Sequence, residues 1–239
     1  MCSKYLIIII ILILFTSLSF GQYNGNSFMI GINGVYTTSA KIYLYPNSSD
    51  VVLRNTSFPL SDIINPGISF RYRLSDDLLI GFSTEYMTKT ENGRNLTVFS
   101  NNKTVTIDVE DGFIMVPFEL SLYYLLPFST ENFKFLMGGG GAYYYGKQIR
   151  NFGDAGVKSS ETHISYGIQV SISMDYLITN HISVRGAMKF RDPQFTVKNI
   201  YDHKIVNYNG NILDLAQNSF VSKINVDGVT FVAGAAYSF

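Results

Sequence analysis

Two short motifs in the sequence place a serine two residues after a histidine: His-Ile-Ser at residues 163–165 and again at residues 181–183. Residues two apart on a β-strand point to the same face, so each histidine has the spacing of a base beside a serine nucleophile. No acidic residue that would orient either histidine is identifiable. The motifs alone therefore favour polar residues at strand ends, and no catalytic residue is predicted.

A second group of residues with chemical potential consists of charged side chains at alternate positions of otherwise apolar segments. Their charges nearly cancel, as a buried polar network requires, because an unpaired interior charge is costly. We expect Glu119 to pair with Arg185 near mid-strand, and Asp175 to pair with Arg71 or Arg73 nearer one end. The residues of this predicted internal network are Arg71, Arg73, Glu85, Glu119, Asp175, Arg185 and Lys189.

The sequence predicts no cofactor, no metal site and no nucleic-acid partner. The glycine run at Met137–Gly141 lacks the Lys-Ser/Thr pair and the following helix of a phosphate loop. The aspartates of the predicted loops do not have calcium-loop spacing. The 18 Lys and Arg residues equal the 18 Asp and Glu residues, so no net positive field attracts nucleic acid.

Eight long segments that alternate between apolar and polar or small residues must position these side chains. Segment 164–176 has the clearest alternation, and about ten residues is the length a tilted strand needs to cross the hydrocarbon of a bilayer. Charged residues make up only 15% of the chain, against roughly 25% in soluble domains. The segments are residues 28–37, 64–74, 78–88, 113–125, 133–145, 164–176, 182–190 and 229–239.

The connections between these segments alternate in length. Residues 75–77, 127–132 and 179–181 form short turns, which predicts that one end of a barrel carries the turns and both chain ends. The other connections are long and polar. Some contain alternating stretches that would extend the hairpins, so a barrel of ten strands also remains possible. These long connections are residues 38–63, 89–112, 146–163 and 191–223.

The N-terminus has the three parts of a secretory signal peptide. Lys4 precedes an apolar run at residues 5–15, and small residues follow up to Gly21. We expect residues 1–21 to be removed, leaving one domain at residues 22–239. Cys2, the single cysteine of the sequence, lies in the part to be removed.

The C-terminal segment ends on an aromatic residue, where soluble domains usually end in frayed polar residues. It resembles the closing strand of bacterial outer-membrane β-barrels, whose assembly signal has a glycine five residues before the end, an aromatic residue two before it and a terminal phenylalanine. Gly234, Tyr237 and Phe239 match this signal, whereas Val232 stands where that family usually has a polar residue.

The chain as a whole resembles the small outer-membrane barrels of the OmpA/OmpX type. The resemblance implies an all-β, closed antiparallel up-and-down transmembrane barrel of eight strands in the bacterial outer membrane. Its implied partners are outer-membrane lipids, the barrel-assembly machinery and an extracellular ligand or surface partner. The implied role is structural or surface-interacting and non-enzymatic, through loops at residues 38–63, 89–112 and 191–223.

Three alternatives remain open from the sequence. The first is a narrow pore or transporter for small or hydrophobic solutes. The second is a lipid A-modifying hydrolase using His163 and Ser165, because outer-membrane lipid A deacylases carry a His-X-Ser motif. The third is a soluble lipocalin-like barrel, which would turn the apolar faces inward around a ligand.

Overall fold

The computed structural model describes residues 26–100, 103–162, 164–215 and 217–239. The predicted signal peptide at residues 1–21, with Cys2, lies outside these ranges. Within them, no helix is long and apolar enough to cross a membrane. The elements are β1 (Phe28–Tyr43), α2 (Val51–Asn55), β2 (Ser57–Arg73), β3 (Leu78–Glu85), β4 (Met87–Ser100), β5 (Lys103–Leu125), β6 (Phe133–Phe152), β7 (Ala155–Thr162), β8 (Ser165–Leu177), β9 (Ile182–Arg191), β10 (Gln194–Tyr201), β11 (Ile205–Tyr208), β12 (Asn211–Leu215), β13 (Ser219–Asn225) and β14 (Thr230–Ser238).

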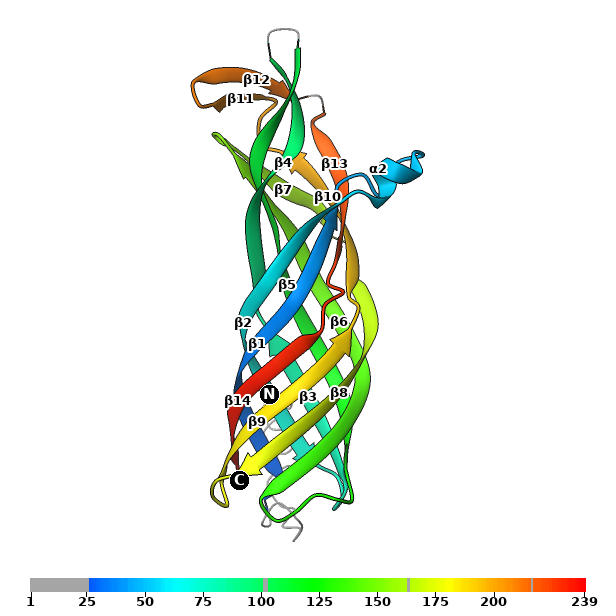
Figure 1. The fold of residues 1–239 in the computed structure, drawn as a ribbon, viewed down its shortest axis with the longest axis vertical. Helices are drawn as coiled ribbons and strands as arrows, with labels where there is room; N and C mark the ends of the chain where they lie inside the picture. The colour runs from blue at the N-terminus through cyan, green and yellow to red at the C-terminus, as the bar shows by residue number, and fades with distance from the viewer. Residues whose placement is uncertain (1–25, 101–102, 163, 216) are drawn as a thin grey trace, which may run out of the picture.

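All strands of the described chain join one antiparallel sheet, so the predicted all-β class is confirmed (Figure 1). The prediction of an eight-stranded barrel gave too few strands, because this sheet has 14 strands. Consecutive pairings nevertheless close a ring in the order β1, β2, β3, β5, β6, β8, β9, β14 and back to β1. A closed ring leaves no unpaired edge in this part of the molecule.

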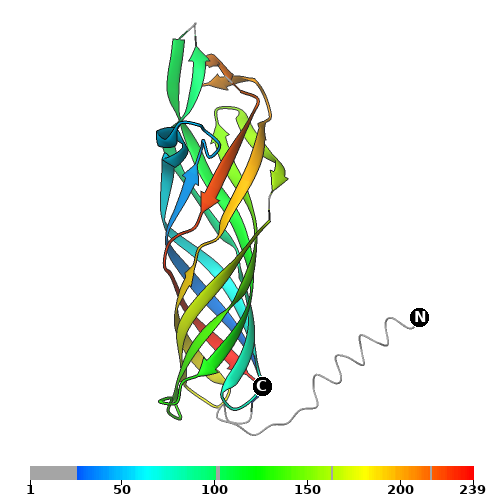
Figure 2. The same cartoon turned by 90° about the vertical axis from the view of Figure 1, so that its right-hand side faces the viewer.

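The predicted long loops are largely strands, which corrects the sequence-based boundaries. β1 continues to Tyr43, β5 starts at Lys103 and β6 continues to Phe152. These longer strands, with β4, β7, β10 and β13, form an extension beyond the ring, seen in the upper half of Figures 1 and 2. Within the connection 38–63, which was expected to be a loop with strand-like stretches, residues 51–55 form α2, whose first turn is capped by the Asp50 side chain.

The short turns lie where the sequence placed them. The turns after β2, β5 and β8 are at the same end of the barrel as the C-terminus (Figures 1 and 2). At the opposite end, β11 and β12 form a hairpin whose turn residues, Asn209 and Gly210, have φ values of 52° and 81°. Positive φ at both positions is the signature of a two-residue hairpin turn, which explains the Asn-Gly pair.

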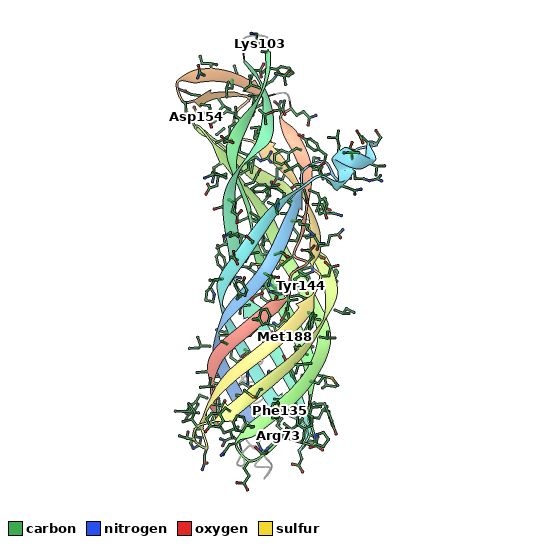
Figure 3. All side chains as sticks on the ribbon, viewed as in Figure 1. Arg73, Lys103, Phe135, Tyr144, Asp154 and Met188 are labelled. Atoms are coloured by element: carbon green, nitrogen blue, oxygen red, sulfur yellow. The ribbon has the colours of Figure 1, made fainter. Side chains whose placement is uncertain are left out.

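The outer surface of the ring is apolar, with side chains projecting from every strand (Figure 3). Ile168 on β8 is 81% exposed, whereas the next residue, Gln169, is 2% exposed inside the barrel. This orientation is the reverse of a soluble lipocalin-like barrel, so that alternative is wrong. A series of outward aromatic rings in contact crosses six neighbouring strands: Phe28, Phe70, Phe82, Phe118, Tyr143 and Tyr166.

The interior contains three apolar clusters stacked along the barrel. The basal cluster lies near the short turns and includes Leu79, Leu125 and Leu136. The middle cluster includes Phe113 and Tyr144. The upper cluster fills the extension and consists of Leu96, Val98, Ile107, Val109, Phe152, Ala155, Tyr201, Val206, Leu213 and Leu215.

Candidate functional site in the barrel interior

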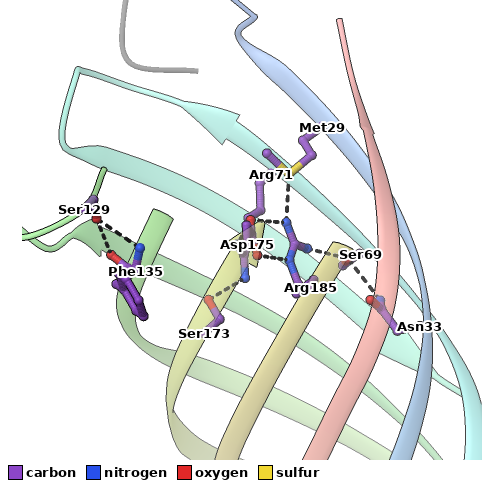
Figure 4. A network of polar contacts seen from close by, with 9 residues as sticks. All are labelled: Met29, Asn33, Ser69, Arg71, Ser129, Phe135, Ser173, Asp175 and Arg185. Atoms are coloured by element: carbon purple, nitrogen blue, oxygen red, sulfur yellow. Dashed lines mark hydrogen bonds and ion pairs between the residues drawn. The ribbon is translucent and has the colours of Figure 1, made fainter. Parts of the chain in front are cut away.

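The first polar network lies inside the ring and is centred on Asp175, whose side chain is fully buried (Figure 4). Arg185 donates to both carboxylate oxygens, with Nε at 2.7 Å from Oδ1 and Nη2 at 2.8 Å from Oδ2. Arg71 donates from Nη1 to Oδ2 at 3.1 Å. Both arginines are at most 5% exposed, so the Asp175 carboxylate binds two buried guanidinium groups.

Polar neighbours use the remaining donors of these arginines. Arg71 Nη2 donates to Ser173 Oγ at 3.2 Å, and its guanidinium lies 4.2 Å from the centre of the Tyr123 ring. Arg185 Nη1 donates to Ser69 Oγ at 3.1 Å (Figure 4). These contacts fix the orientation of both planar guanidinium groups inside the barrel.

A second group of charges is centred on Glu119, which is 1% exposed. Lys189 Nζ lies 2.5 Å from Glu119 Oε2, and Arg191 Nη1 lies 2.8 Å from Oε1. Arg191 also forms an ion pair with Glu85. Two cations therefore face two carboxylates, and this group is neutral overall.

All seven residues of the predicted internal network lie inside the barrel, and the predicted Asp175–Arg71 pair is present. The predicted pair of Glu119 and Arg185 is absent, because Arg185 lies opposite Asp175 in the β8–β9 register and binds it instead. Arg191 was not among the predicted residues, because it lies in the segment 191–223 that was expected to be a loop. Arg191 lies two residues after Lys189, and side chains two apart on a strand point to the same face. The alternation that places Lys189 inside the barrel therefore also predicts Arg191 there.

A third polar network lies higher, in the extension, where the sequence predicted loops. Arg150 donates to Asp111 from Nε at 2.6 Å and from Nη2 at 2.8 Å, and both side chains are at most 3% exposed. Arg150 also donates to the Tyr201 hydroxyl at 3.1 Å. Burial lowers the pKa of Arg150, but hydrogen bonds and charge from Asp111 outweigh it and raise the pKa above its ordinary value.

The residues of the C-terminal assembly signal close the ring against β1. The backbone N–H of Phe239 donates to the Phe28 carbonyl at 2.9 Å, and the two rings lie 5.1 Å apart. Tyr237 points outward and is 52% exposed. A Cβ at Gly234 would lie 2.5 Å from Asn33 Oδ1, so close packing inside the ring requires glycine there.

The described parts of the two His-Ile-Ser motifs lie at the starts of β8 and β9. His163 lies outside the described residues, and Ser165 is half-buried on the inward side of β8. His181 Nδ1 lies 2.9 Å from the Ser238 carbonyl oxygen, so this ring contacts the end of β14. No group of three or more potential metal ligands occurs in the part of the chain that the structure describes.

The Tyr144→Phe substitution is expected to stabilise the barrel by about 1 kcal/mol. Tyr144 is fully buried, and its hydroxyl has no hydrogen-bond partner among the described residues. Denaturant unfolding followed by far-UV circular dichroism would measure the change. The matched control is Tyr145→Phe, because Tyr145 is the next residue of β6 and is 48% exposed. Destabilisation by Tyr144→Phe would mean that the hydroxyl has a partner, such as a buried water.

Comparison with known proteins relates the fold, and not the sequence, to characterised molecules. No family model and no curated protein sequence matches the chain. The outer membrane protein OprG from Pseudomonas aeruginosa has 15% identity and a TM-score of 0.60, with 90% of this chain and 96% of OprG covered. Ail of Yersinia pestis has 10% identity, a TM-score of 0.46, and coverage of 90% and 99%. Neisserial surface protein A has 14% identity, a TM-score of 0.44, and coverage of 89% and 97%. The likeness to OprG shows that the chain has the fold of a bacterial outer-membrane β-barrel protein.

Proposed function

We propose that this chain is a non-enzymatic integral protein of the bacterial outer membrane, closed to solutes, that acts through the extension of its strands outside the membrane. The observation that carries this proposal is the filled interior: three apolar clusters alternate with buried ionic networks from the short turns to the upper hairpins. A barrel of eight strands has only enough room for side chains to fill it.

The apolar outer surface of the ring supports the membrane location. On β8, the outward residues from Tyr166 to Tyr176 are apolar and 39–81% exposed. Because lipid offers no hydrogen bonds, a sheet in the hydrocarbon must close on itself, as this ring does. We infer export by the signal peptide at residues 1–21 and recognition of the Gly234–Phe239 segment by the assembly machinery.

The interior supports a solid barrel over the alternative of a narrow pore. The cavity beside the lower charge networks has a volume of about 40 Å³. Such a space holds a few water molecules at most. The middle apolar cluster, with Phe113 and Tyr144 fully buried, separates this cavity from the Arg150–Asp111 network above.

Purified protein in planar lipid bilayers is therefore expected to give no steady, resolvable conductance. The reason is that an ion entering from either end meets an apolar cluster, whose side chains cannot replace its hydration shell. The measurement is single-channel recording of the full mature chain, beside the Glu119→Ala variant. Steady conductance that Glu119→Ala changes would contradict the solid barrel and favour the pore.

Membrane fractionation and heat-modifiability on gels test the location and the barrel, because folded outer-membrane barrels resist SDS until boiled. Trypsin added to intact cells tests which end is outside. Cleavage confined to the extension, which contains Lys147, Arg150 and Lys158, supports its exposure at the cell surface. Recovery of the chain as a soluble protein without a heat-dependent shift would refute the proposal.

A further inference from the structure

The hairpin formed by β6 and β7 separates soon after its turn. These strands pair only at Asn151 with Gly156 and at Phe152 with Ala155. Below the turn, β7 pairs with β10 over residues 157–162, while β6 remains paired with β5. β8 joins the free side of β6 only from Tyr144 downward. Residues 145–150 of β6 and 157–162 of β7 thus each have one edge without a described strand partner.

A cleft of about 490 Å³ lies between these two edges. In an antiparallel strand, alternate residues direct their backbone N–H and C=O groups to the same side, so each edge presents pairing groups to the cleft. Backbone groups of this kind need hydrogen-bond partners, and an unpaired edge is a template for another strand. The six residues at 145–150 offer about 20 Å of extended edge.

The side chains around the cleft define the chemistry that fits it. Lys147 and Lys158 line the cleft, and no carboxylate is among its lining residues. The Lys158 side chain is 84% exposed and forms a surface ion pair with Asp202 at 3.2 Å. Lys147 is exposed and has no ion pair among the described residues. Tyr145 and Ile149 add apolar surface on the outward face of β6.

We propose that this cleft binds an extended acidic peptide segment of another protein, which adds as a strand to the free edge of β6 or β7. Backbone pairing supplies the affinity, and the two lysines select acidic side chains at alternate positions. The proposal rests on the surface-interaction role proposed above and gives that role a site and a class of partner.

Fluorescence anisotropy with the refolded mature chain in non-ionic detergent tests the charge preference. The probes are labelled eight-residue peptides that alternate Glu with Val or Lys with Val. We expect the acidic peptide to bind at least tenfold more tightly than the basic one. The Lys147→Glu/Lys158→Glu double variant should reverse this order, whereas Lys103→Glu, at the tip of the β4–β5 hairpin, should leave it unchanged.

Acidic peptides N-methylated at alternate residues test the pairing itself. N-methylation of the peptide residues whose backbone N–H groups face the free edge of β6 or β7 should abolish binding, because it removes the donors that pair with that edge. Equal binding by the peptides methylated in either register would overturn strand addition. Failure of both unmethylated peptides to bind a chain that still shifts on boiling would overturn the cleft proposal and leave the outer-membrane barrel intact.

Sedimentation analysis of the same samples distinguishes an external partner from a second copy of the chain. The proposal expects no concentration-dependent dimer. A dimer that the Lys147→Glu/Lys158→Glu variant abolishes would overturn the assignment to another protein.

Discussion

Replacing Asp175 with asparagine is expected to destabilise the folded barrel by about 3–5 kcal/mol, enough to abolish SDS resistance at room temperature. The carboxylate is fully buried and receives three hydrogen bonds from Arg71 and Arg185. The substitution removes the negative charge that both buried guanidinium groups bind. The chain contains no tryptophan, so unfolding should be followed by far-UV circular dichroism and by the heat-dependent shift on gels.

Two variants separate the charge effect from a general sensitivity to substitution. Asp214→Asn changes an exposed acid in the upper hairpin and should not shift the unfolding midpoint. Arg71→Met/Asp175→Leu/Arg185→Met removes all three charges and should be more stable than Asp175→Asn, because no unpaired buried charge remains. A loss below 1 kcal/mol in Asp175→Asn would mean that water or another acid neutralises the arginines.

Much of the ring could be predicted from the sequence, because lipid outside and packed side chains inside give a period of two over many residues. The extension could not, because the arrangement of polarity reverses along one strand. In the ring, β5 turns Leu120 and Leu122 outward and Glu119 inward. In its upper part, the same strand turns Ile107 and Val109 inward and Asp108 outward. The outward apolar face of β5 therefore ends before the strand does.

The partners of the internal charges were predictable only in part, for a geometric reason. Which residues face inward follows from alternation, and this identified Glu119, Asp175 and Arg185. Pairing between adjacent strands depends on register, which brings Asp175 opposite Arg185. The contact between Glu119 and Arg191 joins β5 and β9, which are not neighbours in the ring. Such a contact depends on the diameter and stagger of the closed barrel, and the alternation within one strand does not determine either of them.

Replacing Asp111 with asparagine is expected to destabilise the extension selectively, by about 3–5 kcal/mol, because it leaves Arg150 buried without its carboxylate. Asp111 is fully buried and receives two hydrogen bonds from Arg150. The middle apolar cluster separates this network from the one around Asp175. Trypsin added to intact cells should therefore cleave the extension of Asp111→Asn faster, while the gel shift on boiling is retained.

Comparing Asp111→Asn with Asp175→Asn tests whether the ring and the extension are stabilised independently of each other. The ring has a continuous ladder of hydrogen bonds around its circumference, whereas the extension depends on its own apolar cluster and on the Arg150–Asp111 pair. Glu91→Gln, a change at a half-buried side chain of β4 with Lys89 3.2 Å away, serves as the control and should leave cleavage unchanged. If Asp111→Asn also abolishes the gel shift, ring and extension unfold as one cooperative unit. If cleavage alone increases, the extension opens independently while the membrane barrel stays closed, as a surface-binding region on a rigid base would.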